Sequence, residues 1–182
     1  MTSRDSALPA SGHGHGEPWR AHYPPGVDWD LSFAPRPVHR LIEEAAGRAP
    51  QRICTHFLGR TMTYQEIKIL VDQAARGLQL MGVGRGSRVG LFLPNTPTFL
   101  VAYYAILKAG GTVVNFNPLY STEELEHQIR DSGTEIMVTL DLKALFGKVE
   151  ALLQQGLLAK AIVASFPSLL PPMKATIFRM AR

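Results

Sequence analysis

Between residues 88 and 164, short apolar runs alternate with amphipathic helical patterns, and this alternation restricts the possible folds more than any other feature. The apolar runs cover residues 88–93, 112–116, 135–140 and 161–164, and apolar residues at helical spacing fill the intervals. Strands and helices that alternate through short links are typical of βαβ units. The sequence therefore predicts an α/β fold with a mainly parallel sheet flanked by helices.

The interval at residues 97–109 predicts a helix that is apolar on almost every side. Thr96 and Pro97 supply an N-terminal cap and a first-turn proline, which favour a helix start. A helix without a polar face has to be buried on most sides. Gly110 and Gly111 end it, and we expect at least one of them to have a positive φ or to pack too closely for a side chain.

Upstream of this region the pattern predicts a helix and a small hairpin. Residues 38–48 have apolar residues at helical spacing. Residues 52–58 and 60–63 predict two short strands, and Gly59 between them is a suitable turn residue. The predicted fold therefore carries a small N-terminal hairpin beside the parallel sheet.

Two further helix starts are marked by a capping box, in which a Ser or Thr and a Glu three residues later bond to each other's amides. Thr63 is followed by Glu66, and Ser121 is followed by Glu124. The first of these helices is predicted to end at Gly82.

The two ends of the chain differ in character from the part between them. Residues 1–35 are rich in Gly, Pro, Ser and His and predict an irregular lead-in. Within it, the two His and one Glu of residues 13–17 could catch a metal ion, but a flexible terminus lacks the rigidity of a selective site. Residues 36–165 form the predicted domain, and residues 166–182 predict an apolar and basic connector that is truncated.

The connector contains a predicted helix that starts near Pro172. Steps of four and three residues would place an apolar stripe on it, formed by Met173, Ile177 and Met180. Two interpretations stay open: the connector packs on a missing domain, or it makes a weak peripheral membrane contact helped by basic residues.

Composition excludes several classes of protein. Because Cys54 is the single cysteine, the chain can form neither a disulfide framework nor a metal cluster made of cysteines. We expect its thiol to be buried and inert. No apolar run reaches about 18 residues, and the first 30 residues do not resemble a signal peptide. The formal net charge of +4 comes from scattered basic residues, so no nucleic-acid partner is implied. Together these features favour the cytoplasm.

Three short motifs suggest chemistry but lie in the wrong context. The glycines of residues 82–87 follow a predicted helix and precede a strand, the reverse of a dinucleotide-binding loop. Gly147-Lys148 lacks the rest of a phosphate loop and falls inside a helix. His127 and Asp131 match an acyltransferase pattern, but a solvated helix face explains them better.

Four stretches carry a resemblance to a known family. They are residues 63–66, residues 82–97, residues 108–120 and residues 123–133. In this order and at these separations they resemble the N-terminal region of adenylate-forming, AMP-binding enzymes. Asn-Pro-Leu-Tyr at 117–120, followed by Glu-Leu-Glu-His-Gln at 124–128, resembles bacterial long-chain fatty-acid–CoA ligases most. The resemblance implies that the chain is part of the larger N-terminal domain of such an enzyme.

The resemblance also implies a two-step reaction for the parent protein. A fatty acid and ATP give an acyl-adenylate and pyrophosphate, and the CoA thiol then displaces AMP to give acyl-CoA. Mg²⁺ would assist the first step by offsetting phosphate charge. Fatty acid, ATP and CoA are thus the implied partners, with a homodimer contact and a weak contact with the inner membrane as further expectations.

The family's phosphate-binding motif, its Tyr-Gly-x-Thr-Glu stretch, its ribose-binding Asp and its catalytic Lys have no counterpart in these 182 residues. Leu119 stands where some relatives place an Arg that can meet the CoA nucleotide. We therefore expect no catalytic, cofactor-binding or metal-binding residue here, and an inactive chain. The alternative is a stand-alone, non-catalytic α/β binding or interaction module.

Overall fold

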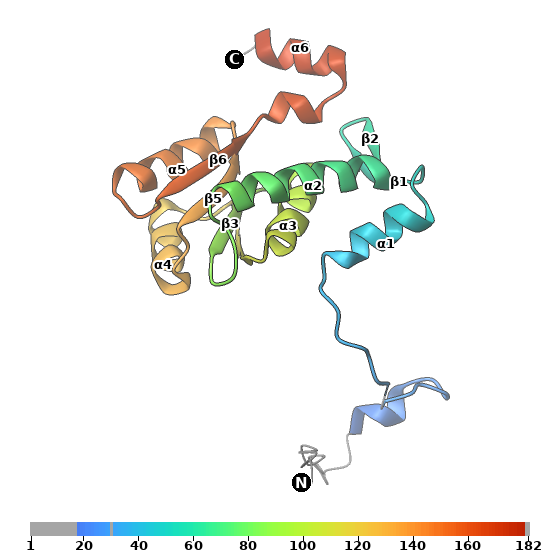
Figure 1. Cartoon of the computed structure of the whole chain (residues 1–182). Helices are drawn as coiled ribbons and strands as arrows, with labels where there is room; N and C mark the ends of the chain where they lie inside the picture. Colours follow the sequence, from blue (N-terminus) through green and yellow to red (C-terminus); the bar gives the residue numbers. More distant parts are fainter. Residues whose placement is uncertain (1–17, 30, 181–182) are drawn as a thin grey trace, which may run out of the picture. The chain divides into compact units, whose positions relative to one another are not determined.

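The computed structural model describes residues 18–29 and 31–180, which fall into two compact units that divide between Pro35 and Arg36 (Figure 1). In the first unit the backbone forms one short 3-10 helix, η1 (Pro18–His22), where the sequence predicted only irregular structure. The rings of Tyr23 and Trp29 meet edge to face at 4.8 Å in this unit. Residues 13–17, with their two His and one Glu, lie outside the described residues.

The second unit is built on a four-stranded parallel sheet in the order β4-β3-β5-β6. The strands are β3 (Arg88–Phe92), β4 (Thr112–Phe116), β5 (Ile136–Leu140) and β6 (Lys160–Ala164). β3 pairs with β4 on one side and with β5 on the other, so it occupies the middle of the sheet with β5. The predicted α/β class and parallel sheet are confirmed.

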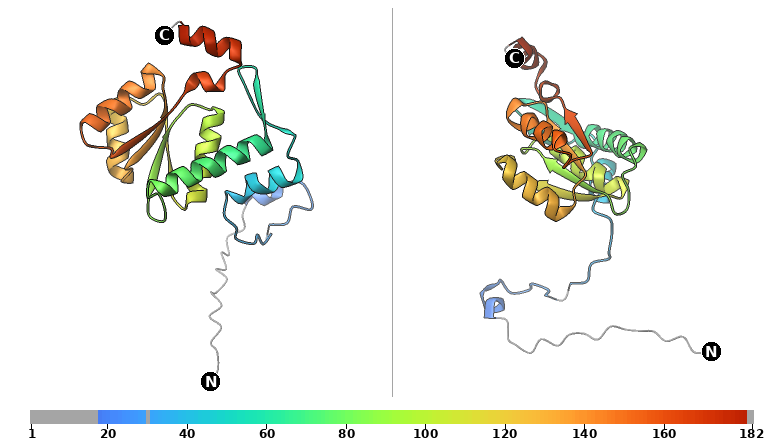
Figure 2. Two further views of the ribbon diagram at one scale, coloured as in Figure 1. Left: turned by 45° about the horizontal axis from the view of Figure 1, so that its top comes forward. Right: turned by 90° about the vertical axis from the view of Figure 1, so that its left-hand side faces the viewer.

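Helices cover both faces of this sheet (Figure 2, left). α2 (Tyr64–Leu80) and α3 (Pro97–Ala109) lie on one face and pack closely against each other. α4 (Thr122–Ser132) and α5 (Lys143–Gln154) lie on the other face. Every residue of α3 is buried or partly buried, as its apolar sequence predicted.

The predicted helix and hairpin upstream of α2 are also present. α1 (Arg40–Arg48) leads into the antiparallel pair β1 (Ile53–Phe57) and β2 (Arg60–Thr63). The two turn residues, Leu58 and Gly59, have φ values of 49° and 95°. A two-residue turn with positive φ at both positions has a twist that matches the right-handed twist of the two strands it joins.

The caps formed as the sequence predicted. In the first capping box the Thr63 amide donates to Glu66 Oε2 at 2.7 Å, and the Glu66 amide donates to Thr63 Oγ1 at 3.2 Å. Ser121 and Glu124 repeat this arrangement at the start of α4. Gly110 ends α3 with a φ of +90° in the left-handed region, so the expectation for the Gly110-Gly111 pair is confirmed.

A network of charged side chains joins three helices on the α2–α3 side. Lys108 of α3 bonds Glu43 of α1 and Asp72 of α2, the latter at 2.6 Å. Lys68 bonds the other oxygen of Asp72 at 2.6 Å. The hydrogen bond from Lys108 holds the pKa of Glu43 below its usual value. Burial alone would raise the pKa of Asp72, but the hydrogen bonds from Lys108 and Lys68 outweigh it and the net pKa is lowered.

The tail folds back on the hairpin. η2 (Phe166–Leu169) and α6 (Pro172–Met180) follow β6, and the helix starts where the sequence predicted. The ring of Phe166 meets Phe57 of β1 at 6.3 Å and Phe178 of α6 at 5.1 Å. Arg60 of β2 donates to the carbonyl oxygen of Ser168. Part of this chain therefore already serves as the packing surface of the connector.

Candidate functional site at the carboxyl edge of the sheet

The connections of β3 and β5 leave the sheet in opposite directions. From β3 the chain runs through α3 to β4, and from β5 it runs through α5 to β6, on the other face. In open α/β sheets, ligands bind outside the carboxyl ends of the strands where such a reversal occurs. A ligand-binding site is therefore expected at the edge of the sheet beyond Phe92 and Leu140.

A hollow of about 280 Å³ with both polar and apolar lining residues lies beside the carboxyl end of β3. It is lined by three residues of β1 and four from the start of α3 and the loop before it: Thr55, His56, Phe57, Asn95, Thr96, Pro97 and Phe99. The β1 hairpin supplies one wall, and the strand-to-helix turn supplies the other.

The exposed polar side chains of the hollow are those of His56 and Asn95. Thr55 Oγ1 is buried and has no hydrogen-bond partner within the described part of the chain. Thr96 is 8% exposed, and its Oγ1 accepts from the Phe99 amide at 3.4 Å as the cap of α3. Asn95, the residue before Thr96, is exposed and offers an amide side chain.

The hydroxyl groups of the hollow are not arranged for nucleophilic catalysis. An activated hydroxyl needs a base within hydrogen-bond reach. Among the described residues, neither Thr55 nor Thr96 is bonded to a carboxylate or an imidazole. The hollow can bind a polar group but lacks the arrangement of a nucleophile and its base.

The carboxyl end of β5 is occupied by the chain itself. Asp141 follows this strand, and its Oδ1 accepts from the Phe166 amide at 2.6 Å, which fixes the start of the tail. Thr139 is fully buried, and its Oγ1 has no partner among the described residues. The ligand-binding potential of this edge therefore lies on the β3 side.

Sequence reasoning missed this hollow. Asn95 and Thr96 directly follow a buried strand, and that position in a parallel sheet was the available signal. The local pattern indicated Thr96 only as a helix cap. No local pattern could have assigned Thr55, because the hairpin reaches β3 only in the folded chain.

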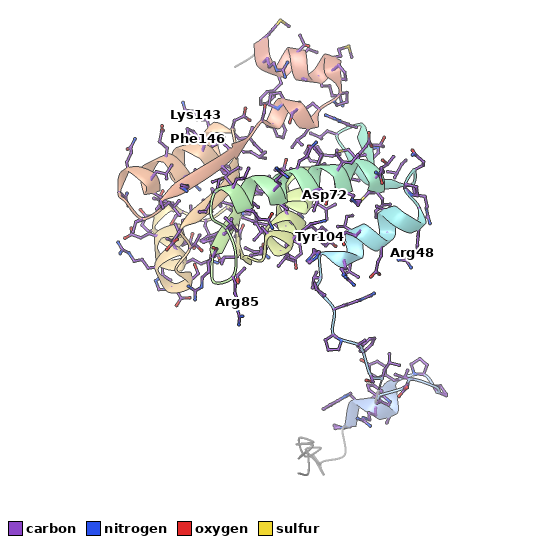
Figure 3. The ribbon with its side chains drawn as sticks, in the orientation of Figure 1. Arg48, Asp72, Arg85, Tyr104, Lys143 and Phe146 are labelled. Atoms are coloured by element: carbon purple, nitrogen blue, oxygen red, sulfur yellow. The ribbon has the colours of Figure 1, made fainter. Side chains whose placement is uncertain are left out.

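The motifs singled out in the sequence lie elsewhere. The glycine-rich turn at residues 82–87 joins α2 to β3 and begins with Gly82 at a φ of +90°, as the interpretation as a helix end and turn required. Gly147 and Lys148 lie inside α5, and Lys148 donates to the carbonyl oxygen of Tyr120. Figure 3 shows Lys143 and Phe146 on the same helix.

His127 and Asp131 share one face of α4. They line a shallow hollow with polar neighbours from the start of that helix: Tyr120, Glu123, Glu124 and Gln128. This setting agrees with the interpretation as a solvated helix face. Cys54 is half-buried in β1, and burial raises the pKa of its thiol, so its reactive thiolate form is disfavoured.

The described part of the protein has no cluster of metal ligands, and its glycine-rich turn is not a phosphate site. Across residues 18–29 and 31–180, no three His, Cys, Asp or Glu side chains are grouped so that they could hold a metal ion. The glycine-rich turn precedes a strand, so its amides do not form the helix start that receives phosphate. The helices of the described part are also too short or too polar to cross a membrane.

Comparison with known proteins gives consistent results. The chain is similar to the long-chain-fatty-acid–CoA ligase of Bacillus subtilis, with 32% identity over 166 residues, which cover 91% of this chain and 29% of the relative. It is also similar to bacitracin synthase 1 of Bacillus licheniformis, with 32% identity over 106 residues, 58% of this chain and 2% of the relative. The chain thus spans less than a third of either protein.

The fold is shared with solved structures. A long-chain-fatty-acid–CoA ligase from Archaeoglobus fulgidus superposes with a TM-score of 0.65 at 23% identity, over 74% of this chain and 28% of that protein. The profile of the AMP-binding enzyme family matches residues 42–174, which include the sheet, its helices and the hollow beside β3. The chain therefore belongs to the AMP-binding enzyme family.

Proposed function

We propose that the chain is the N-terminal scaffold of an ATP-dependent long-chain fatty acid–CoA ligase. In the parent enzyme a fatty-acid carboxylate oxygen would bond the α-phosphorus of ATP, and pyrophosphate would leave. The sulfur of CoA would then bond the acyl carbon, and AMP would leave. The implied cofactors are ATP, CoA and Mg²⁺, all bound outside this chain.

The extent of the sequence match carries this proposal. Within one family, the fatty-acid ligase of B. subtilis aligns with 91% of the chain, whereas bacitracin synthase 1 aligns with 58%. The longer alignment takes in nearly the whole chain and therefore favours a fatty-acid ligase over a synthase of the bacitracin kind.

Two proteins test the proposal. The first is the 182-residue chain alone, assayed for palmitate-dependent exchange of pyrophosphate into ATP, and we expect no signal above a blank without protein. The second is a chimera in which the chain replaces the matching N-terminal segment of the B. subtilis ligase, and we expect it to form palmitoyl-CoA. Exchange activity of the chain alone would contradict the scaffold role by showing that the chain is itself catalytic. A folded but inactive chimera would contradict it in favour of a stand-alone, non-catalytic binding module.

We also propose a cytoplasmic parent protein with α6 as a weak contact for the inner membrane. The supporting observation is that the predicted apolar stripe of α6 is exposed, with Met173 at 74%, Ile177 at 55% and Met180 at 77%. Co-sedimentation with anionic vesicles, before and after Ile177→Asp, tests the contact, and equal binding would refute it. A homodimer stays a prediction, which sedimentation velocity of the chimera would test.

A further inference from the structure

A hollow at the end of α1 carries two positive charges. It encloses about 450 Å³, and its lining comes from the end of α1, the turn after it and the first residues of β1 and α2: Ala45, Arg48, Ala49, Arg52, Ile53 and Tyr64. Arg48 is the last residue of α1 (Figure 3), and Arg52 directly precedes β1. The volume lies within the range of small-molecule sites, and the hollow shares no lining residue with the one beside β3.

Backbone hydrogen bonds hold the turn between the two arginines. The Ala49 amide donates to the carbonyl oxygen of Ala45 at 2.9 Å, and the Arg52 amide donates to that of Ala49 at 3.1 Å. At the start of α2, the Tyr64 amide donates to the carbonyl oxygen of Arg52 at 3.0 Å. These bonds fix the backbone positions of both arginines, and they already engage three carbonyl oxygens of residues that line the hollow.

The carboxylates of neighbouring segments are bonded elsewhere. Glu44, one turn before Arg48, pairs with Arg36 at 3.0 Å. Glu66, in the first turn of α2, closes the capping box described above. Among the described residues, neither Arg48 nor Arg52 has an ion pair. Two like charges without a counter-ion repel each other, so an anion between them would be stabilising.

The lining residues indicate the kind of anion that fits. The planar guanidinium group donates two parallel hydrogen bonds to a phosphate, and it stays charged at every physiological pH. The carbonyl end of α1 carries a partial negative charge that one cation is enough to offset, so a second cation is left for a ligand. The rest of the lining is alanine, isoleucine and a half-buried tyrosine, which suits a small apolar body.

We propose that this hollow binds a phosphate monoester that carries a small apolar body. The phosphate lies at Arg48 and Arg52, and the body lies against Ala45, Ile53 and Tyr64. A soluble organic phosphate and the head group of a phosphatidate lipid share this chemistry. The inference rests on the hollow alone, so it holds whether or not the parent protein is a fatty-acid ligase.

The test measures binding by the 182-residue chain with calorimetry, without ATP or CoA, using phenyl phosphate and phenyl sulfate as probes. We expect saturable binding of phenyl phosphate, roughly three- to fivefold tighter than that of phenyl sulfate, because a dianion meets two exposed cations. Arg52→Gln should weaken the binding of phenyl phosphate by a similar factor and remove most of this preference. Arg40→Gln removes the same charge from an exposed arginine at the start of α1 and should change neither affinity.

A second set of measurements tests the apolar body and the source of the phosphate. Ala45→Leu narrows the hollow from the helix side, so it should weaken phenyl phosphate several-fold and leave the thermal midpoint nearly unchanged, because both residues favour helices. Co-sedimentation with phosphatidylcholine vesicles that contain phosphatidate separates the two sources. Sedimentation that Arg52→Gln reduces would identify a lipid head group, and its absence would identify a soluble phosphate ester.

Three results would overturn the proposal. They are no saturable binding of phenyl phosphate by the wild type, wild-type affinity in a folded Arg52→Gln variant, and an equal loss in Arg40→Gln, which would show a general effect of charge. If Arg52→Gln unfolds the chain, Arg48→Gln removes the other cation and takes its place. Because the assay contains neither nucleotide nor CoA, none of these results bears on the ligase proposal, which the pyrophosphate exchange tests separately.

Discussion

Lys174 of α6 donates a hydrogen bond of 2.9 Å to the carbonyl oxygen of Leu58 in the hairpin turn, 116 residues earlier in the chain. Leu58 has a positive φ, and it is the only non-glycine residue with one in the described part of the chain. The bond ties the last described helix of the chain to its first pair of strands.

Lys174→Met keeps most of the side chain but removes the donor. We expect it to lower the free energy of unfolding by about 0.5–1.5 kcal/mol, the usual net value of one hydrogen bond. Urea denaturation would measure the change, and faster amide exchange in α6 would locate it. Arg179→Met on the same helix is the control, and an equal loss there would show that the bond contributes nothing specific.

The Lys108 network predicts a pH dependence of stability. The folded-state pKa values of Glu43 and Asp72 are lowered, so the stability they contribute is present above their unfolded pKa of about 4 and is lost as the pH falls through their folded pKa values. Burial opposes the charge of Lys108, but Asp72 and Glu43 outweigh it and raise its pKa. Its contribution is therefore lost only as the pH rises through that raised value.

Lys108→Met should make the acid limb of the stability curve shallower, because both carboxylates then lose a cation. At pH 7 we expect a loss of about 0.5–2 kcal/mol, since each partly exposed ion pair contributes about 1 kcal/mol or less. Thermal denaturation between pH 3 and pH 7 is the measurement. An acid limb unchanged from that of the wild type would mean that the network does not set the pH dependence.

Gly110 holds a left-handed conformation at the end of α3, with a φ of +90°. Gly110→Val should cost more than about 1 kcal/mol, because a β-branched residue is strongly disfavoured there. Gly110→Asn should cost less, since Asn tolerates this conformation best after Gly. Chemical denaturation ranks the two variants by their free energy of unfolding. A Val variant as stable as the Asn variant would show that the left-handed conformation does not set the cost.

Gly90 in the middle strand β3 has no room for a side chain. A Cβ there would lie 2.7 Å from Met137 Sδ and 2.8 Å from Phe116 Cε2, both on buried residues. We expect Gly90→Ala to lower the free energy of unfolding by about 1–3 kcal/mol through overpacking. Gly147→Ala, in open space within α5, should instead stabilise the chain by about 1 kcal/mol. Calorimetric melting of both variants shows whether each substitution lowers or raises the stability of the chain.

Local features of the sequence were enough to predict the α-helices and strands, but not the 3-10 helices η1 and η2. The pairs Thr63–Glu66 and Ser121–Glu124 fix helix starts because both partners lie within one turn. The alternation of apolar runs and helical patterns predicted the parallel sheet for a similar reason, since each βαβ unit is a short segment of chain.

Contacts between distant segments could not be predicted in this way. The hollow beside β3 brings Thr55 to Asn95, and a second, apolar hollow lined by α2, α3, β5 and β6 brings Gly77 to Ile162. Neither pair can be recognised from the spacing of nearby residues, because its members meet only after the sheet has set the positions of α2, α3 and β6. The bond from Lys174 to Leu58 belongs to the same group, which is why neither interpretation of the connector included a contact with the hairpin.

The strand order of the sheet also has a consequence for synthesis on the ribosome. β3, at the centre, is made before β4 and β5, the two strands that pair with it. A chain that emerges N-terminus first therefore exposes β3 without a partner until α3 and β4 are made, and one edge of β3 stays open until α4 and β5 follow. During that interval α2 and α3 can cover one face of β3, but its backbone edges stay open to mispairing or to a chaperone.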